Sequence, residues 1–192
     1  SAKEWEMADD YSSLMVTLQD GVTFADKTAV GIDAEYDIYG GRALTADDVK
    51  YSYDRVMGFD GVTQVQMEQT DWPGSLTMLD SVEVLDDSTV KFNFNTNTEL
   101  DVQKFMCVML NICGPEWDEL SDEQKTDFHY AAGTGPFILT DYVNDNSMTF
   151  VANPNYWDTD DEGNALPYLD EIKLVHMTDT ATMLSSFISG EL

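Results

Sequence analysis

The chain has 192 residues, of which 37 are acidic and 9 are basic, so its formal net charge is −28. Hydrophobic residues make up 43% of the chain, which is enough for a folded core, and the acidity therefore does not indicate disorder. The charge argues against nucleic acid and anionic lipid as direct partners, because both require surfaces rich in lysine and arginine. No stretch of the sequence approaches the roughly 20 apolar residues of a membrane span.

The first predicted strand covers residues 13–18, where leucine, valine and leucine fall on one face at a period of two. Asp20-Gly21 is a turn signal, so residues 22–24 are expected to start the second strand of a hairpin. Residues 25–44 show no sustained period, which predicts a loop or an insertion.

The next segment is a helix with both of its ends marked. Thr45 is a natural N-cap, and Asp48 three residues later completes a shortened capping box. Gly58 is the expected end of the helix. Its apolar face consists of Val49, Tyr53, Val56 and Met57.

A second hairpin is predicted over residues 82–94, with its turn at Asp86-Asp87-Ser88. Asp101 is expected to cap a helix that ends before Gly114. The apolar residues at helical spacing in that segment are Val102, Phe105, Met106 and Met109. Residues 59–78 are expected to be a loop, and residues 116–128 a short polar helix that starts at Glu116 or Ser121.

From Gly133 onward strands prevail. Two are predicted over residues 137–142 and 148–151, and a third carries Ile172, Leu174 and His176 in alternation. A last helix is expected to start at Asp179 or Thr180, to stop at Gly190, and to turn its apolar residues inward. Those residues are Met183, Leu184, Phe187 and Ile188. Hairpins that alternate with isolated helices predict an α+β or mixed α/β fold.

The sequence carries no motif of a nucleophilic enzyme, a phosphate-binding loop or a zinc protease, which predicts that the protein is not an enzyme. His129 and His176 lie far apart, and His176 is interpreted as a strand histidine with its hydrogen bonds satisfied. Cys107 and Cys113 are interpreted as two buried thiols, although a disulfide stays open in an oxidising compartment. No cofactor or metal is expected.

One acidic string, residues 158–163, partly matches the sequence pattern of a calcium-binding loop. Asp158 to Gly163 places acidic groups at the first, third and fifth positions and glycine at the sixth. The twelfth position is Leu169, where a bidentate glutamate is needed, so a solvated turn is the better interpretation. A calcium-dependent extracellular surface or adhesion domain is the alternative that this string supports.

The glycines of Gly133-Thr134-Gly135 allow the backbone to approach a ligand closely or, equally well, to make a tight structural turn. The aromatic residues Tyr130, Trp72 and Trp117 either line a cleft or pack in the interior.

Several strings, taken in order along the chain, resemble the extracytoplasmic solute-binding proteins of ABC importers, in the dipeptide, oligopeptide and nickel class. No single string is specific, but the ordered set is, and it spans nearly the whole chain. The strings are Ala2–Glu6, Leu18–Phe24, Leu44–Ser52, Val82–Val90, Gly133–Phe137, Asn153–Trp157, Leu166–Asp170 and Ser189–Leu192.

The resemblance implies a lobe of the periplasmic-binding-protein type and a chain that is a fragment of a two-lobe clamshell. Residues 1–132 are then the extra subdomain of lobe one, and residues 133–192 are part of the core of that lobe. Two segments depart from the family pattern. Residues 25–43 are longer than usual, and Ile112 to Glu116 replaces a Val-Pro-Lys-like turn.

The function implied by the resemblance is the capture of a peptide, or another small solute, and its delivery to an ABC permease in the membrane. The protein is then extracytoplasmic, with a lipid anchor at full length, and a monomer without nucleic-acid partners. The residues expected to line the ligand cleft are Tyr130, Gly133, Thr134 and Gly135.

Overall fold

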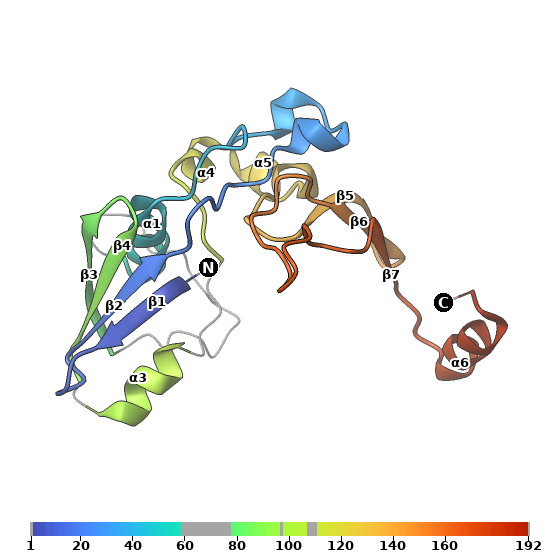
Figure 1. Cartoon of the computed structure of the whole chain (residues 1–192). Helices are drawn as coiled ribbons and strands as arrows, with labels where there is room; N and C mark the ends of the chain where they lie inside the picture. Colours follow the sequence, from blue (N-terminus) through green and yellow to red (C-terminus); the bar gives the residue numbers. More distant parts are fainter. Residues whose placement is uncertain (1, 59–77, 97, 107–110, 192) are drawn as a thin grey trace.

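The computed structural model describes residues 2–58, 78–96, 98–106 and 111–191. The first part of the chain forms a four-stranded antiparallel sheet, in the order β1-β2-β4-β3 (Figure 1). Its strands are β1 (Ala2–Met7), β2 (Ser13–Leu18), β3 (Leu79–Asp86) and β4 (Thr89–Phe94). The predicted strand at residues 13–18 and the predicted second hairpin are both present.

The core of this part lies between the sheet and two helices, α1 (Ala46–Met57) and α3 (Glu99–Met106). Along β4, the inward-facing residues Val90, Phe92 and Phe94 are buried and alternate with less buried residues. The Phe92 ring meets Tyr53 of α1 at 4.9 Å and Phe105 of α3 at 5.1 Å between ring centroids. Aromatic rings from both helices therefore pack against the same strand, β4.

Helix α1 begins and ends where the sequence predicts. The Thr45 backbone N–H donates to the Asp48 carboxylate at 2.9 Å, and the Thr45 hydroxyl donates to it at 3.2 Å. Gly58 ends the helix with a left-handed φ of 72°, which glycine adopts without steric cost.

The predicted hairpin over residues 13–24 is wrong. The edges of β2 are occupied by β1 and β4, so residues 22–24 pair elsewhere. The Phe24 N–H donates to the Arg42 carbonyl, and the Leu44 N–H donates to the Val22 carbonyl, both at 2.9 Å. Residues 22–24 and 42–44 thus form the two stems of the segment between them.

Residues 25–44 are not a plain loop. They contain two short 3-10 helices, η1 (Lys27–Val30) and η2 (Ala34–Tyr36). The carboxylate of Asp26 caps η1, and Gly31 ends it in the left-handed region. This segment lies beside the short helices α4 and α5 (Figure 1).

The predicted single helix at residues 116–128 is also wrong, because Leu120 and Ser121 adopt extended backbone. Three short pieces replace it: α4 (Glu116–Glu119), α5 (Asp122–Lys125) and η4 (Phe128–Tyr130). Ser121 caps α5 in a capping box with Gln124.

The start predicted for the helix at Asp101 is displaced. Helix α3 begins at Glu99, because the Thr98 carbonyl already accepts from the Asp101 and Val102 N–H groups. Val102 and Phe105 are buried as expected, whereas Met106 is 43% exposed. Met109 lies outside the described residues, and so does the loop predicted at residues 59–78 except for its last residue.

The last part of the chain is a three-stranded antiparallel sheet followed by a helix (Figure 1). Its strands are β5 (Phe137–Val143), β6 (Ser147–Ala152) and β7 (Glu171–Val175), in that order, and the helix is α6 (Thr180–Ser189). Asp179 caps α6 and Gly190 ends it, as predicted. The mixed α+β class is confirmed.

The inward orientation predicted for the apolar face of α6 is wrong for this chain. Leu184, Phe187 and Ile188 are 57%, 69% and 76% exposed, and Met183 is 46% exposed. The described part of the chain therefore does not cover the face that helical spacing creates.

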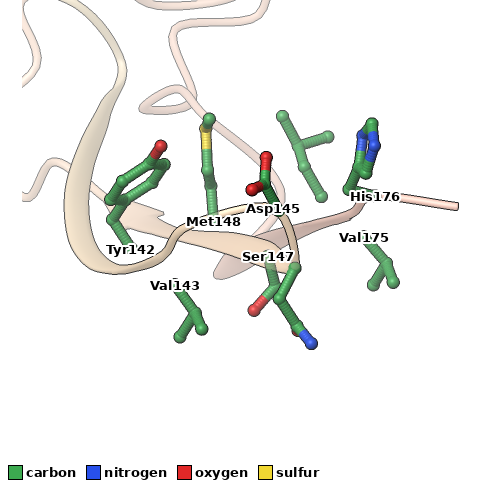
Figure 2. A pocket seen from close by; sticks show the side chains of 9 residues that line it. Tyr142, Val143, Asp145, Ser147, Met148, Val175 and His176 are labelled. Atoms are coloured by element: carbon green, nitrogen blue, oxygen red, sulfur yellow. The ribbon is translucent and has the colours of Figure 1, made fainter.

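The prediction that His176 is a strand residue is wrong, because His176 directly follows the end of β7, and its side chain is exposed. It lines an open hollow of about 290 Å³ at the turn between β5 and β6. Figure 2 shows Tyr142, Met148 and His176 projecting to one side of the hairpin, and Val143, Ser147 and Val175 projecting to the other. Within the described ranges, no helix has the length and apolar character needed to cross a membrane.

Candidate functional site

A cavity of about 620 Å³ lies where four parts of the chain meet. Helix α1 supplies Arg55 and helix α4 supplies Trp117. Two connecting segments complete the lining. Those segments are residues 111–113 and residues 131–135. The second of them, which we call the 131–135 wall, contains three of the four residues expected to line a ligand cleft.

The main-chain carbonyls of the 131–135 wall accept hydrogen bonds from two different regions of the chain. The Gly133 carbonyl accepts from the Ala25 N–H at 2.9 Å. The Gly135 carbonyl accepts from the side-chain amide of Asn153 at 3.1 Å, and Asn153 is only 2% exposed. The Asn153 N–H in turn donates to the Pro136 carbonyl at 2.9 Å, so the wall has a defined backbone path.

Gly133 and Gly135 are not required by the local backbone. Neither has a φ in the left-handed region, and a Cβ built on either would meet no heavy atom within 4 Å. A tight structural turn would demand glycine through φ or through crowding. The open space in front of these two residues instead leaves room for another molecule to approach the main chain.

Arg55 also lines the cavity. Its side chain is 19% exposed, and its Nε lies 3.3 Å from a carboxylate oxygen of Asp118. Burial raises the pKa of Asp118, but the hydrogen bond from Tyr51 and the charge of Arg55 outweigh this and hold the pKa below its usual range. Asp118 therefore stays ionised and keeps the guanidinium in place.

The turn at residues 112–114 is fastened to α1 and to the 25–44 segment. The Ser52 hydroxyl lies 3.0 Å from the Cys113 carbonyl and 2.9 Å from the Cys113 N–H. The Gly114 N–H donates to the Tyr39 hydroxyl at 3.1 Å. Cys113 is a free, half-buried thiol whose pKa is raised by burial, and Cys107 lies outside the described residues.

An ion-pair network lies directly behind this turn. Arg42 donates to Asp48 at 2.7 Å and to Glu116 at 2.6 Å, and its guanidinium lies 4.8 Å from the centre of the Phe24 ring. A Cβ on Gly114 would collide with the Arg42 guanidinium. Glycine at position 114 is thus required by close packing, in contrast to Gly133 and Gly135.

Tyr130, the fourth expected cleft residue, is not part of the cavity lining. It is 8% exposed, its hydroxyl accepts from the Gln124 amide at 2.9 Å, and its ring meets Tyr36 edge-on at 5.1 Å. Trp117 does line the cavity, and Trp72 lies outside the described residues. Sequence reasoning missed Arg55, whose only signal was a basic residue near the end of a helix in a chain with 9 basic residues.

The carboxylate of Asp160, in the acidic string at residues 158–163, accepts hydrogen bonds from nearby residues of the chain. Asp160 accepts from the Glu162 N–H at 2.9 Å, from the Asn164 N–H at 2.7 Å and from the Tyr168 hydroxyl. The Tyr168 hydrogen bond is the first of the contacts that lower the pKa of Asp160. Over the described ranges, no group of three or more histidine, cysteine or acidic side chains could hold a metal ion. These contacts give the calcium alternative no support.

Comparison with known proteins assigns the family. The whole chain, residues 1–192, matches the family described as bacterial extracellular solute-binding proteins, family 5 middle. The chain belongs to this family. The resemblance inferred from the ordered strings is thereby confirmed.

Three relatives illustrate the range of the family. Di/tripeptide-binding protein 1 of Pseudomonas aeruginosa is 27% identical over 99% of this chain and 34% of its own length. Heme-binding protein A of Haemophilus influenzae is 26% identical over 81% of this chain and 28% of its own length. The periplasmic binding protein DppA of Helicobacter pylori, solved with the peptide STSA, has a TM-score of 0.76 at 22% identity and covers 100% of this chain and 36% of its own.

The named relatives are binding proteins, which favours a binding role over catalysis. The likeness to the solved structure shows the fold of a periplasmic binding protein. The chain spans about a third of the length of these relatives.

Proposed function

We propose that this chain is part of a receptor outside the cytoplasmic membrane that captures a peptide and delivers it to an ABC permease. The family and its peptide-binding members support the ligand class. The receptor is not an enzyme in this proposal, and it acts as a monomer that a lipid anchor holds at the surface. The expected division into a subdomain over residues 1–132 and a core part over residues 133–192 belongs to the same proposal.

The observation that carries the ligand site is the free space in front of Gly133 and Gly135. Peptides offer backbone donors and acceptors that pair with exposed main chain, as in the recognition of extended peptides along a strand. The 131–135 wall presents such main chain at the exposed Gly133 and Gly135. Arg55, which also lines the cavity, has guanidinium N–H groups beyond the Nε that faces Asp118, and these suit a carboxylate. We therefore assign Gly133, Thr134 and Gly135 to ligand contact and give Tyr130 a supporting place behind them.

Isothermal titration of the protein at its full natural length tests this proposal. The probes are dialanine, trialanine and Ser-Thr-Ser-Ala, with haem as the competing ligand suggested by one relative. Binding of a peptide is expected. Binding of haem with no binding of any of the three peptides would overturn the peptide assignment.

The Gly133→Ala variant locates the site. The added methyl group meets empty space in the free protein, so the free energy of unfolding should hold or rise by about 0.4–1 kcal/mol. Peptide affinity should fall roughly tenfold, which corresponds to about 1.4 kcal/mol. Ala165→Val, which adds methyl groups to an exposed loop outside the cavity, is the matched control and should leave affinity unchanged. Unchanged affinity in Gly133→Ala would remove the wall from the site.

A further inference from the structure

The 25–44 segment is packed onto the backbone that leads into the 131–135 wall. The Tyr36 ring stacks on His129 at 4.8 Å and meets Tyr130 at 5.1 Å. Ala25 donates to the Gly133 carbonyl at 2.9 Å. The 25–44 segment thus contacts the wall at Gly133 and the two residues before the wall, His129 and Tyr130.

Lys27 is the most deeply buried charged residue of this contact, with 0% exposure. Its ammonium donates to the main-chain carbonyl of Ala131 at 2.8 Å and to that of His129. These two carbonyls flank Tyr130, and the carbonyl of Ala131 belongs to the first residue of the wall. A single side chain therefore holds the backbone on both sides of Tyr130.

A lysine is a costly way to fill an interior space, because its charge loses hydration. Burial lowers the pKa of Lys27 to about 8, against the opposing charges of Asp37 and Asp127. A hydrocarbon side chain of similar length would fill the same volume without that cost. Unlike a hydrocarbon, the ammonium donates hydrogen bonds, and these fix the positions of the His129 and Ala131 carbonyls.

We propose that Lys27 is a positioning residue for ligand binding, which acts by holding the 129–131 backbone so that the 131–135 wall faces the cavity. The inference rests on the proposed function for its ligand, but not for its effect on the wall. The 25–44 segment then serves as a brace for the binding site.

Two measurements on the protein at its full natural length test this inference. In Lys27→Met, which keeps the length of the side chain and removes its donors, amide hydrogen exchange of residues 130–135 should accelerate roughly tenfold relative to the rest of the protein. The affinity for Ser-Thr-Ser-Ala should weaken by roughly the same factor. Lys27→Gln, which keeps an amide donor, should recover part of both losses.

Lys3→Met is the matched control, because it removes the same charge from an ion pair with Asp20 at the first sheet. It should change neither exchange at the wall nor affinity. If Lys27→Met does not fold, Tyr36→Ala removes the ring behind His129 and should also accelerate exchange at residues 130–135.

The outcomes separate the two proposals. Wild-type protein that binds none of the peptides contradicts the proposed function, while the exchange measurement still decides the role of Lys27. Unchanged exchange at residues 130–135 together with unchanged affinity would overturn the positioning role. A uniform acceleration across the protein, with no recovery in Lys27→Gln, would also overturn it and would indicate a general loss of stability.

Discussion

At the scale of single residues, three glycines show how the same residue type serves opposite needs. Gly114 has no room for a side chain, whereas Gly133 and Gly135 have open space in front of them. All three have ordinary backbone conformations, so the difference lies in their surroundings and not in φ. The sequence shows glycine at each position but not the atoms that come near it.

We therefore expect Gly114→Ala to destabilise the protein. The new methyl group must displace the Arg42 guanidinium from Asp48 and Glu116, and such overpacking costs about 1–3 kcal/mol. Urea unfolding of the protein at its full natural length measures the change. Gly133→Ala is the internal control, and an equal loss in the two variants would contradict the packing argument.

At the scale of elements, α1 is held at its start by a carboxylate with two roles. Asp48 is 2% exposed, accepts from the Thr45 N–H at 2.9 Å and pairs with Arg42 at 2.7 Å. Asp48 thereby joins the helix to the stem of the 25–44 segment, and Glu116 continues the network into α4. The cap was predictable from local sequence, but the ion pair was not, because Glu116 is 74 residues from Arg42 along the chain.

Asp48→Ala should accordingly cost more than the loss of a helix cap. Loss of the cap costs about 1 kcal/mol. Loss of the hydrogen bonds from the Arg42 guanidinium adds about 1.5–3 kcal/mol, while Arg42 keeps its ion pair with Glu116. Asp47→Ala changes an exposed acidic residue in the same turn of the helix and should stay within about 0.5 kcal/mol of wild type. Urea unfolding midpoints of both variants check this, and similar midpoints would refute the network as a source of stability.

At the scale of the whole molecule, the exposed apolar residues gather in the last part of the chain. Phe187 and Ile188 of α6 are 69% and 76% exposed, and Leu174 of β7 is 53% exposed. Relatives in the family are about three times as long as this chain, and α6 has the amphipathic spacing of a helix that packs on a core. We infer that polypeptide outside residues 1–192 covers this face in the complete receptor.

One substitution should then have opposite consequences in two contexts. In the protein at its full natural length, Phe187→Glu should lower the free energy of unfolding by about 3 kcal/mol, as expected for loss of a buried aromatic ring. In residues 1–192 alone, the same substitution should cost no stability and should reduce self-association in sedimentation experiments. Residues 1–192 alone should also bind the peptide probes weakly or not at all.

Leu85→Glu is the control, because Leu85 is 51% exposed on β3 and should behave alike in both lengths of chain. Equal effects of Phe187→Glu in both contexts would contradict a covering segment. Tight binding of Ser-Thr-Ser-Ala by residues 1–192 would contradict the need for a second lobe.

The sequence by itself determined what depends on neighbours along the chain. Alternation located β2, β3 and β4, and caps located α1 and α6, because strand period and helix ends are set by a few adjacent residues. The family was identifiable for the same reason. Each matching string consists of a few adjacent residues, and the order of the strings along the chain is visible in the sequence.

Tertiary structure decided everything that depends on distant partners. Residues 22–24 pair with residues 42–44 because β1 and β4 occupy β2, and no local pattern records that competition. Contacts across the fold bring Lys27 to the carbonyls of residues 129 and 131, and they separate Tyr130 from the cavity that Gly133 and Gly135 line. Burial and proximity are properties of the packed chain. The net charge of −28 indicated no site, whereas the packed chain forms a cavity that the 131–135 wall lines.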